Sequence, residues 1–254
     1  MAIRKKVDKR QMLELKNITK QYKNKTALDT VNLQIRSGEF ISILGPSGSG
    51  KSTLLNCVSG FDNNFAGDIL VDNTSIKKVS SNKRNIGMVF QNYSLFPHMT
   101  ALENIAYPLK MRKQSVSLAD DMLDKVGLSA HGSKYPHQLS GGQQQRIALA
   151  RAMVYNPQVV LMDEPLGALD LKLRNELQLF VKQMHNEYQA TTVYVTHDLV
   201  EAFSMSDRIV VLNNGIVEQI DTPKNIYKAP INAFVEDFIT SGLQHIQTLS
   251  RVIQ

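Results

Sequence analysis

A glycine-rich stretch with one lysine, at residues 45–53, has the strongest chemical character in the sequence. It satisfies the pattern G-x-x-x-x-G-K-[ST], follows an apolar run at 40–44 and precedes a plausible helix at 52–58. Glycines let the backbone wrap around a phosphate group, so that successive N–H groups and the positive end of the helix point at it. The predicted phosphate loop consists of Gly45, Pro46, Ser47, Gly48, Ser49, Gly50, Lys51, Ser52 and Thr53.

Two side chains of this loop have specific roles in phosphate chemistry. Lys51 can reach the β- and γ-phosphates of a nucleotide, and Ser52 can supply an oxygen ligand to Mg²⁺. GTPases, small-molecule kinases, helicases and transport ATPases all share the motif, so it does not select among them.

Two carboxylates follow a second apolar run. Residues 159–162 read as a buried strand, and Asp163 and Glu164 come directly after it. Because ligand sites of parallel sheets lie at the carboxyl ends of the strands, Asp163 is expected to hold Mg²⁺, directly or through water. Glu164 points elsewhere and could act as the general base that polarises an attacking water. A solvated acidic loop is the alternative.

A second polar motif precedes a helix-like pattern at 144–153. Ser140 occupies the position of a helix N-cap, and Gly141 and Gly142 expose backbone N–H groups ahead of Gln143. The motif is either an ordinary capped helix start or a second phosphate-binding site. In a head-to-tail dimer, it could face the γ-phosphate held by the partner's phosphate loop.

Short apolar runs provide the elements that position these residues. Runs at 40–44, 159–162, 192–195 and 209–212 have strand length, and the first three each lead into a helical pattern. This alternation predicts a parallel sheet covered by helices. Alternating residues between 12 and 40 predict antiparallel strands, and Asn-Gly at 214–215 predicts a hairpin.

The helical patterns fall in three places. The clearest covers 171–188, where the apolar residues share one face; they are Leu173, Leu177, Phe180, Val181, Met184 and Tyr188. Residues 91–150 read as a helical insertion. Residues 223–254 read as a short helical appendix that contains Phe234, Phe238 and Ile239.

Composition excludes several classes of protein. The chain of 254 residues is 43% hydrophobic and 20% charged, which excludes a disordered or collagen-like chain. Its single cysteine, Cys57, excludes an intrachain disulfide framework, and no apolar run approaches the ~18 residues of a membrane span. Five of the basic residues lie within residues 1–10, so a solvated arm is favoured over a nucleic-acid-binding face. Attraction of this arm to an anionic membrane surface is the next option.

Three motifs in this order, at 45–53, 139–143 and 159–165, resemble the ATP-binding cassette (ABC) family of transport ATPases, over about residues 12–222. The resemblance implies an α/β P-loop NTPase fold with a mostly parallel core sheet, an antiparallel β subdomain and a helical subdomain. The implied organisation is a basic tail at 1–11, a nucleotide-binding domain at 12–222 (core 12–90 and 151–222, helical subdomain 91–150) and the appendix at 223–254.

The resemblance assigns further residues. Tyr22 matches an aromatic that stacks on adenine, Gln91 a glutamine that senses Mg²⁺ and faces the membrane partner, and His197 a switch histidine near the γ-phosphate. Ala168, Leu169 and Asp170 match a loop that crosses the dimer interface. The alternatives are purely structural roles: a strand-face aromatic for Tyr22, a surface histidine for His197 and a helix cap for Asp170. The implied Mg²⁺ ligands are Ser52, Gln91 and Asp163.

The family's mechanism is also implied. Two cassettes clamp two ATP molecules, each between one chain's phosphate loop and residues 140–143 of the other, and Glu164 activates water while His197 supports the γ-phosphate. The implied partners are separate transmembrane permease subunits, a second cassette, such as a homodimer supplies, and indirectly an extracellular solute-binding protein. The chain is then a peripheral protein on the cytoplasmic face of the cell membrane, and nucleic acid is not an expected partner.

Residues 91–105 and 164–174 look like the importer branch for polyamines, ferric ion, maltose-type sugars and phosphonates. Leu95, Phe96 and Met99 could form an apolar socket for a membrane-subunit helix, or simply the core of the helical insertion. The 32 residues after 222 are too few for the β-rich regulatory domain of many members, which leaves a polyamine or sugar substrate open. The alternatives are an export ABC ATPase, a soluble ABC ATPase acting on nucleic acid or ribosomes, and a P-loop kinase.

Overall fold

The computed structural model describes residues 10–167 and 170–252. Most of the predicted basic tail, residues 1–9, lies outside these residues, as do Ala168 and Leu169 of the predicted interface loop.

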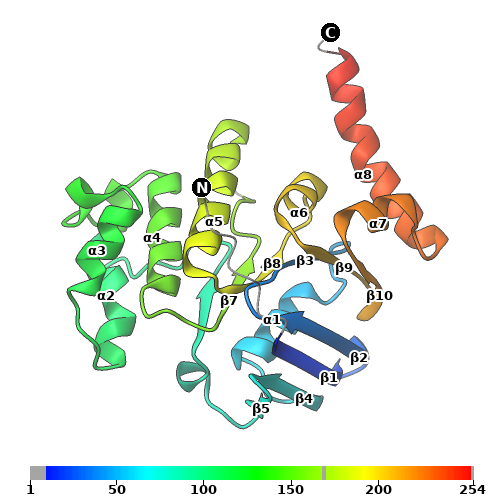
Figure 1. The fold of residues 1–254 in the computed structure, drawn as a ribbon, viewed down its shortest axis with the longest axis horizontal. Coiled ribbons are helices and arrows are strands. Elements are labelled where there is room, and N and C mark those ends of the chain that lie inside the picture. The colour runs from blue at the N-terminus through cyan, green and yellow to red at the C-terminus, as the bar shows by residue number, and fades with distance from the viewer. Residues whose placement is uncertain (1–9, 168–169, 253–254) are drawn as a thin grey trace.

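A six-stranded sheet forms the centre of the molecule (Figure 1). Its strand order is β10-β9-β3-β8-β7-β6, and all neighbours are parallel except the β9–β10 pair. The strands are β3 (Phe40–Leu44), β6 (Ile86–Val89), β7 (Val159–Asp163), β8 (Thr191–Val195), β9 (Arg208–Asn213) and β10 (Ile216–Asp221). The four apolar runs are thus confirmed as strands of a mostly parallel sheet.

A second sheet is antiparallel throughout, in the order β2-β1-β4-β5. It contains β1 (Gln11–Tyr22), β2 (Lys25–Arg36), β4 (Ala66–Val71) and β5 (Thr74–Ser75). The first two strands confirm the alternating pattern predicted between residues 12 and 40.

The β9–β10 hairpin turns at Asn214 and Gly215, whose φ angles are 46° and 80°. Both residues lie in the left-handed region, as a two-residue hairpin turn requires, so the predicted hairpin is confirmed. A Cβ on Gly215 would lie 2.7 Å from the Ala27 carbonyl oxygen of β2, so this turn also packs closely against the antiparallel sheet.

The two faces of the central sheet have different covers. Ile41 and Ile43 of β3 pack in one apolar cluster with α1 (Lys51–Ser59) and the antiparallel sheet. Phe40 of the same strand packs on the opposite face, in the cluster that includes α5 (Leu171–Tyr188). This alternation along a buried strand is the expected two-sided burial of a parallel strand.

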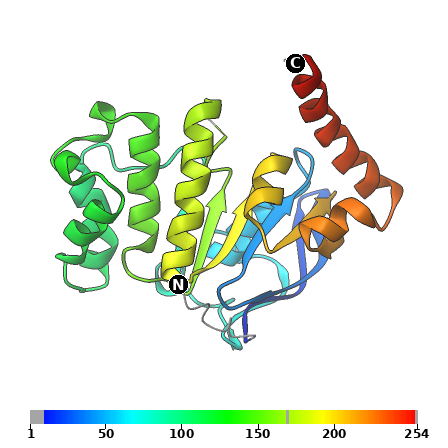
Figure 2. The same ribbon diagram turned by 45° about the horizontal axis from the view of Figure 1, so that its top comes forward.

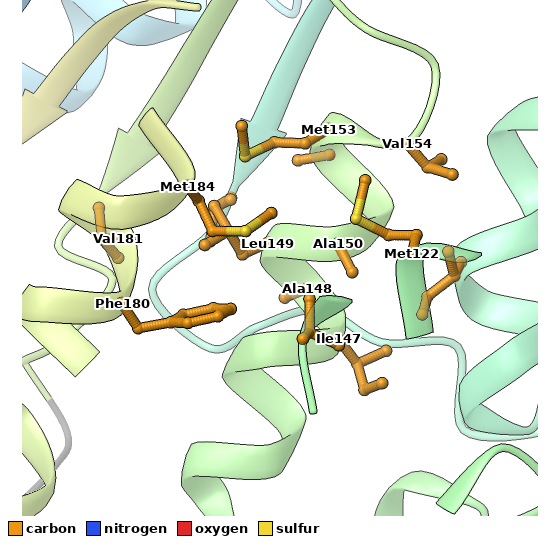
Figure 3. Packing of buried hydrophobic residues seen from close by; sticks show 14 of the residues in the cluster. Met122, Ile147, Ala148, Leu149, Ala150, Met153, Val154, Phe180, Val181 and Met184 are labelled. Atoms are coloured by element: carbon orange, nitrogen blue, oxygen red, sulfur yellow. The ribbon is translucent and has the colours of Figure 1, made fainter. Parts of the chain in front are cut away.

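Three helices separate β6 from β7: α2 (Ala101–Met111), α3 (Leu118–Lys125) and α4 (Gly141–Met153). Short 3₁₀ turns lie at Ser81–Lys83, Ser129–His131 and Pro136–Gln138. Figure 3 shows apolar side chains of α4, such as Ile147 and Met153, between Met122 of α3 and the α5 residues Phe180 and Met184. Helix α4 therefore joins the helical layer to the sheet.

The chain continues through α6 (Leu199–Met205), α7 (Pro223–Lys228) and α8 (Ala233–Val252). Val235 and Ile239 of α8 pack with Leu199 and Ile209, whereas the far end of α8 projects away from the rest of the molecule (Figures 1 and 2). In the part of the chain that the structure describes, no helix combines the length and apolar character needed to cross a bilayer.

Helix α5 has the bounds that its pattern predicts, and it buries a histidine as well as apolar residues. His185 is 5% exposed; its Nδ1 lies 3.0 Å from Thr192 Oγ1 of β8, and its ring meets Phe40 edge-on. Burial, with the nearby Lys182 ammonium, lowers the pKa of His185 from its ordinary 6.5 to about 4, and the Asp207 carboxylate opposes this shift.

This histidine gives a pH dependence of stability. Between pH 6.5 and 4 the unfolded chain binds a proton at residue 185 that the folded chain does not, so stability falls as pH drops. We expect His185 to contribute a loss of about 2 kcal/mol in the free energy of unfolding from pH 7 to pH 5. Urea unfolding of the parent and of His185→Gln checks this, and equal pH slopes in both proteins would contradict it.

Candidate functional site

A cavity of about 330 Å³ opens where β3 ends and α1 begins. Most of the predicted phosphate loop lines it, together with Tyr22 and Glu164. The lining residues are Tyr22, Lys25, Ala27, Ser47, Gly48, Gly50, Lys51, Ser52, Thr53 and Glu164.

The conformation of the loop depends on glycines at points of close backbone approach. A Cβ on Gly45 would lie 2.0 Å from the carbonyl oxygen of Leu212, and one on Gly50 would lie 2.5 Å from that of Ala27. Gly50 is also the N-cap of α1 and has a φ of 106°. The loop is therefore held against β9 and β2, and its end leads directly into the N-terminus of α1.

Lys51 is held inside the loop, 7% exposed. Its Nζ donates to the carbonyl oxygens of Gly45 at 2.8 Å and Pro46 at 2.9 Å. Burial lowers the pKa of Lys51, and the carboxylates of Glu164 and Asp163 oppose that shift. The ammonium group is thus a buried cation at the edge of the cavity, and an anionic ligand there would compensate its lost hydration.

Ser52 and Asp163 meet across the site. The Ser52 hydroxyl of α1 donates to Asp163 Oδ1 of β7 at 3.3 Å. Burial raises the pKa of Asp163, while the hydrogen bond from Ser52 lowers it. A hydroxyl and a half-buried carboxylate are hard oxygen donors of the kind that Mg²⁺ prefers. The described residues contain no cluster of three or more His, Cys, Asp or Glu side chains that could hold a metal by themselves.

Glu164 is the point at which the other predicted catalytic residues meet. Its backbone N–H donates to Val195 O at 2.9 Å, and its φ is 43°, in the left-handed region that a non-glycine residue seldom adopts. His197 Nδ1 lies 3.2 Å from Glu164 Oε2, and the Gln91 amide nitrogen donates to the same oxygen at 3.4 Å. Of the predicted Mg²⁺ ligands, Gln91 therefore contacts Glu164, whereas Ser52 and Asp163 contact each other.

Hydrogen bonds of polar side chains hold the segment that carries His197 in place. Thr196 Oγ1 donates to Glu201 Oε2 at 2.8 Å and accepts from the Asp198 N–H at 3.0 Å. Asp198 in turn caps α6 and accepts from Arg174 Nη1 at 3.3 Å. This network fixes both neighbours of His197, whose own side chain is 64% exposed at the site.

Residues 140–143 form a helix start that does not line this cavity. The Ser140 hydroxyl accepts from Gln143 N at 3.3 Å, and the Gln143 side-chain oxygen accepts from Ser140 N at 3.0 Å, which is a complete capping box. Gly142 is buried: a Cβ there would lie 2.8 Å from Leu173 Cδ1 of α5. Gly141 is half-buried and Ser140 exposed.

The remaining predicted residues are placed as follows. Asp170 caps α5 by accepting from Leu173 N at 3.0 Å, so its capping role is confirmed. Tyr22 is 46% exposed at the cavity. Phe96 lines a second cavity, of about 360 Å³, together with Phe90 and Ser94 on either side of Gln91 in the sequence. Leu95 packs on the helical core.

Two cavity residues, Lys25 and Ala27, are absent from the sequence prediction. Lys25 pairs directly with Tyr22 across the β1–β2 hairpin, so it lies beside the predicted aromatic. The alternating pattern predicts these strands but not their register, and the register is the missing signal.

Comparisons with known proteins agree on one family. A family model described as "ABC transporter" matches residues 28–167. The chain is 47% identical over 232 residues to the spermidine/putrescine import ATP-binding protein PotA of Chromobacterium violaceum, covering 90% of this chain and 64% of that protein. It is 46% identical over 231 residues to PotA of Thermotoga maritima, covering 89% and 63%. The chain thus spans a little under two thirds of the length of these relatives.

Two solved structures of the cassette MJ0796 are also similar. One is described as dimeric and in a post-hydrolysis state bound to ADP and Pi, and the other as the dimeric structure of a bacterial ABC transporter cassette. Each has a TM-score of 0.74 at 39% identity and covers 84% of this chain and 99% of that chain.

The close approach of the loop to β9 can be tested with a matched pair of glycines. Gly48→Ala adds a Cβ in open space at a left-handed position, which costs about 1 kcal/mol of unfolding free energy. Gly45→Ala must also displace the Leu212 carbonyl, and we expect a cost larger by about 1–3 kcal/mol. Urea unfolding measures both, and equal costs would show that the approach to Leu212 is not a constraint.

Proposed function

Because the chain belongs to the ABC transporter family, we propose that it binds and hydrolyses ATP to energise the import of a small solute. The observation that carries this proposal is the convergence of Gln91 and His197 on Glu164 Oε2, beside a cavity lined by the phosphate loop. The site then brings a base and polar partners to the place where a γ-phosphate would lie.

Binding of the nucleotide uses two parts of the cavity lining, the phosphate loop and Tyr22. The phosphates lie against the loop N–H groups and the N-terminus of α1, where Lys51 exchanges its bonds to the Gly45 and Pro46 carbonyls for phosphate oxygens. The base stacks on Tyr22, which also lines the cavity. Lys25 adds positive charge beside it.

Ser52 and Asp163 would hold Mg²⁺, with Gln91 as a further oxygen ligand after its amide turns from Glu164. The bound ion would supply charge neutralisation at the β- and γ-phosphates. The oxygen donors of Ser52 and Asp163 fit this ion. A nearby cation would also lower the pKa of Asp163, which burial now raises.

In the hydrolytic step, Glu164 Oε2 accepts a proton from a water molecule. The water oxygen bonds to the γ-phosphorus while the bond from that phosphorus to the β,γ-bridging oxygen breaks, which leaves ADP and phosphate. His197 orients Glu164 and donates to the γ-phosphate. The left-handed backbone at Glu164 and the hydrogen bonds of Thr196, the residue before His197, fix both groups in position before the nucleotide binds.

A second copy of the chain would complete the site. Residues 140–143 do not line the cavity of their own chain, and Ser140 is exposed beside a helix N-terminus. The two similar cassette structures are both described as dimeric, one with ADP and Pi, which supports pairing of two copies. The proposed pair is head-to-tail. Residues 140–143 and Asp170 of each copy would then face the nucleotide held by the other.

The closing of this pair would drive separate transmembrane permease subunits, which dock beside Gln91 and Phe96. The chain would work at the cytoplasmic face of the membrane as a peripheral subunit, and a solute-binding protein would deliver the solute from outside. The two import proteins at 46–47% identity support import of a small solute such as a polyamine over the exporter or soluble alternatives. The division into tail, core, helical subdomain and appendix is part of this proposal.

Removing the base tests the proposed chemistry. Glu164→Gln keeps the shape of the side chain but cannot accept the proton, so we expect ATP turnover to fall by at least ~100-fold while ATP still binds. Glu176→Gln, which changes an exposed glutamate on α5, is the control and should keep parental turnover. Phosphate release measures turnover. Turnover within a few-fold of the parent would remove Glu164 from the role of base.

Removing the loop cation tests the binding site. Lys51→Ala deletes a charge-assisted contact to phosphate, and we expect the Kd for ATP to rise by roughly 10- to 100-fold. Lys172→Ala, which removes an exposed lysine, should leave the affinity unchanged. Isothermal titration calorimetry provides the comparison, and an unchanged Kd in Lys51→Ala would exclude the phosphate-loop assignment.

A further inference from the structure

We propose that Asp62 is a positioning residue that fixes the ring of Tyr22 as a ready platform for the base of the nucleotide. This inference rests on the function proposed above, in which Tyr22 contacts the base. Asp62 lies in the loop between α1 and β4, whereas Tyr22 is the last residue of β1. Their contact therefore depends on the fold and not on local sequence.

The first contact fixes the end of the ring. The Tyr22 hydroxyl donates to Asp62 Oδ2 at 3.0 Å. Tyr22 is 46% exposed, and an aromatic side chain at such a rim would otherwise sample several rotamers. The hydrogen bond to a carboxylate is charge-assisted, which makes it stronger than a bond between neutral groups.

A buried lysine fixes the carboxylate and one face of the ring. Lys20 is 4% exposed, and its Nζ lies 2.8 Å from Asp62 Oδ1 and 2.7 Å from Oδ2. The same ammonium donates to Asn64 O at 2.7 Å and lies 4.6 Å from the centroid of the Tyr22 ring. The backbone N–H of Asn64 also donates to Asp62 Oδ1, at 2.9 Å.

These contacts give the ring a fixed orientation on two sides. The Lys20 ammonium occupies one face through a cation–π contact, and Asp62 holds the hydroxyl. Tyr22 nevertheless lines the cavity, so a planar base can stack on the ring without first ordering it. Immobilising a side chain on binding lowers affinity by roughly 3- to 10-fold, and the Asp62 contact removes that cost in advance.

A purely structural role for Asp62 makes a different prediction. The Lys20–Asp62 pair also ties β1 to the loop after α1, and loss of that tie would weaken every ligand of the cavity alike. Positioning of Tyr22 affects only the part of affinity that comes from the base. Inorganic tripolyphosphate contacts the phosphate loop but has no base, so it separates the two effects.

The experiment compares Mg²⁺-ATP with Mg²⁺-tripolyphosphate by calorimetry in the parent and five variants. Tyr22→Phe keeps the ring but removes its bond to Asp62, and Asp62→Ala removes the acceptor. We expect each to raise the Kd for ATP by roughly 3- to 10-fold without changing the Kd for tripolyphosphate. The double variant should lose no more than Asp62→Ala, because both changes break one contact. Asp72→Ala, a carboxylate of the β4–β5 turn paired with Arg10, should match the parent.

Other outcomes overturn the inference. Parental affinity for ATP in Tyr22→Phe and Asp62→Ala would show that the contact positions nothing, and parallel losses for both ligands would assign Asp62 a structural role. Tyr22→Ala should lose more ATP affinity than Tyr22→Phe, and equal affinities would mean that the base does not use the ring. If the parent bound neither ligand, the proposed function itself would fall, and this inference with it.

Discussion

The register of three parallel strands is the constraint on which the site depends. Val195 of β8 pairs with Ile43 of β3 on one side and with Asp163 of β7 on the other. The next residues along the three strands therefore emerge at one edge: the phosphate loop after β3, Glu164 after β7 and the His197 segment after β8. The Val195 carbonyl accepts the Glu164 N–H at 2.9 Å, so the ladder extends to the backbone of Glu164, the proposed base.

This edge concentrates features that cost folding free energy. Burial lowers the pKa of Lys51 and raises that of Asp163, so neither charge is well compensated by the protein alone. Glu164 occupies a left-handed backbone conformation, and Gly45 admits no side chain beside Leu212. A nucleotide with its cation would compensate the two charges, so binding would recover part of the free energy that these features cost. Apolar packing elsewhere, such as the α3–α4–α5 layer, supplies the stability that this arrangement requires.

Local patterns predicted the elements well, because strands, helix faces and turns depend on neighbouring residues. The strand at 40–44, the helix at 171–188 and the Asn214-Gly215 turn follow from such patterns. The contacts that local patterns could not predict are non-local. The position of Lys25 beside Tyr22 depends on strand register, and the hydrogen bond between Tyr22 and Asp62 depends on the docking of α1. The burial of His185 was not predicted for the same reason, because its partner Thr192 belongs to another element. Residues 140–143 do not line the phosphate-loop cavity of their own chain, so their proposed role requires a second copy.

The measurement that tests the central claim most directly is site-specific cross-linking between two copies of the chain. Ser47→Cys and Gly141→Cys are combined with Cys57→Ser, which removes the single buried thiol, and with the hydrolysis-blocking change at Glu164. The account predicts a disulfide-linked dimer that forms with Mg²⁺-ATP and not without nucleotide. No cross-link in the ATP-loaded protein, or equal cross-linking without ATP, would contradict a nucleotide held between the phosphate loop of one copy and residues 140–143 of the other.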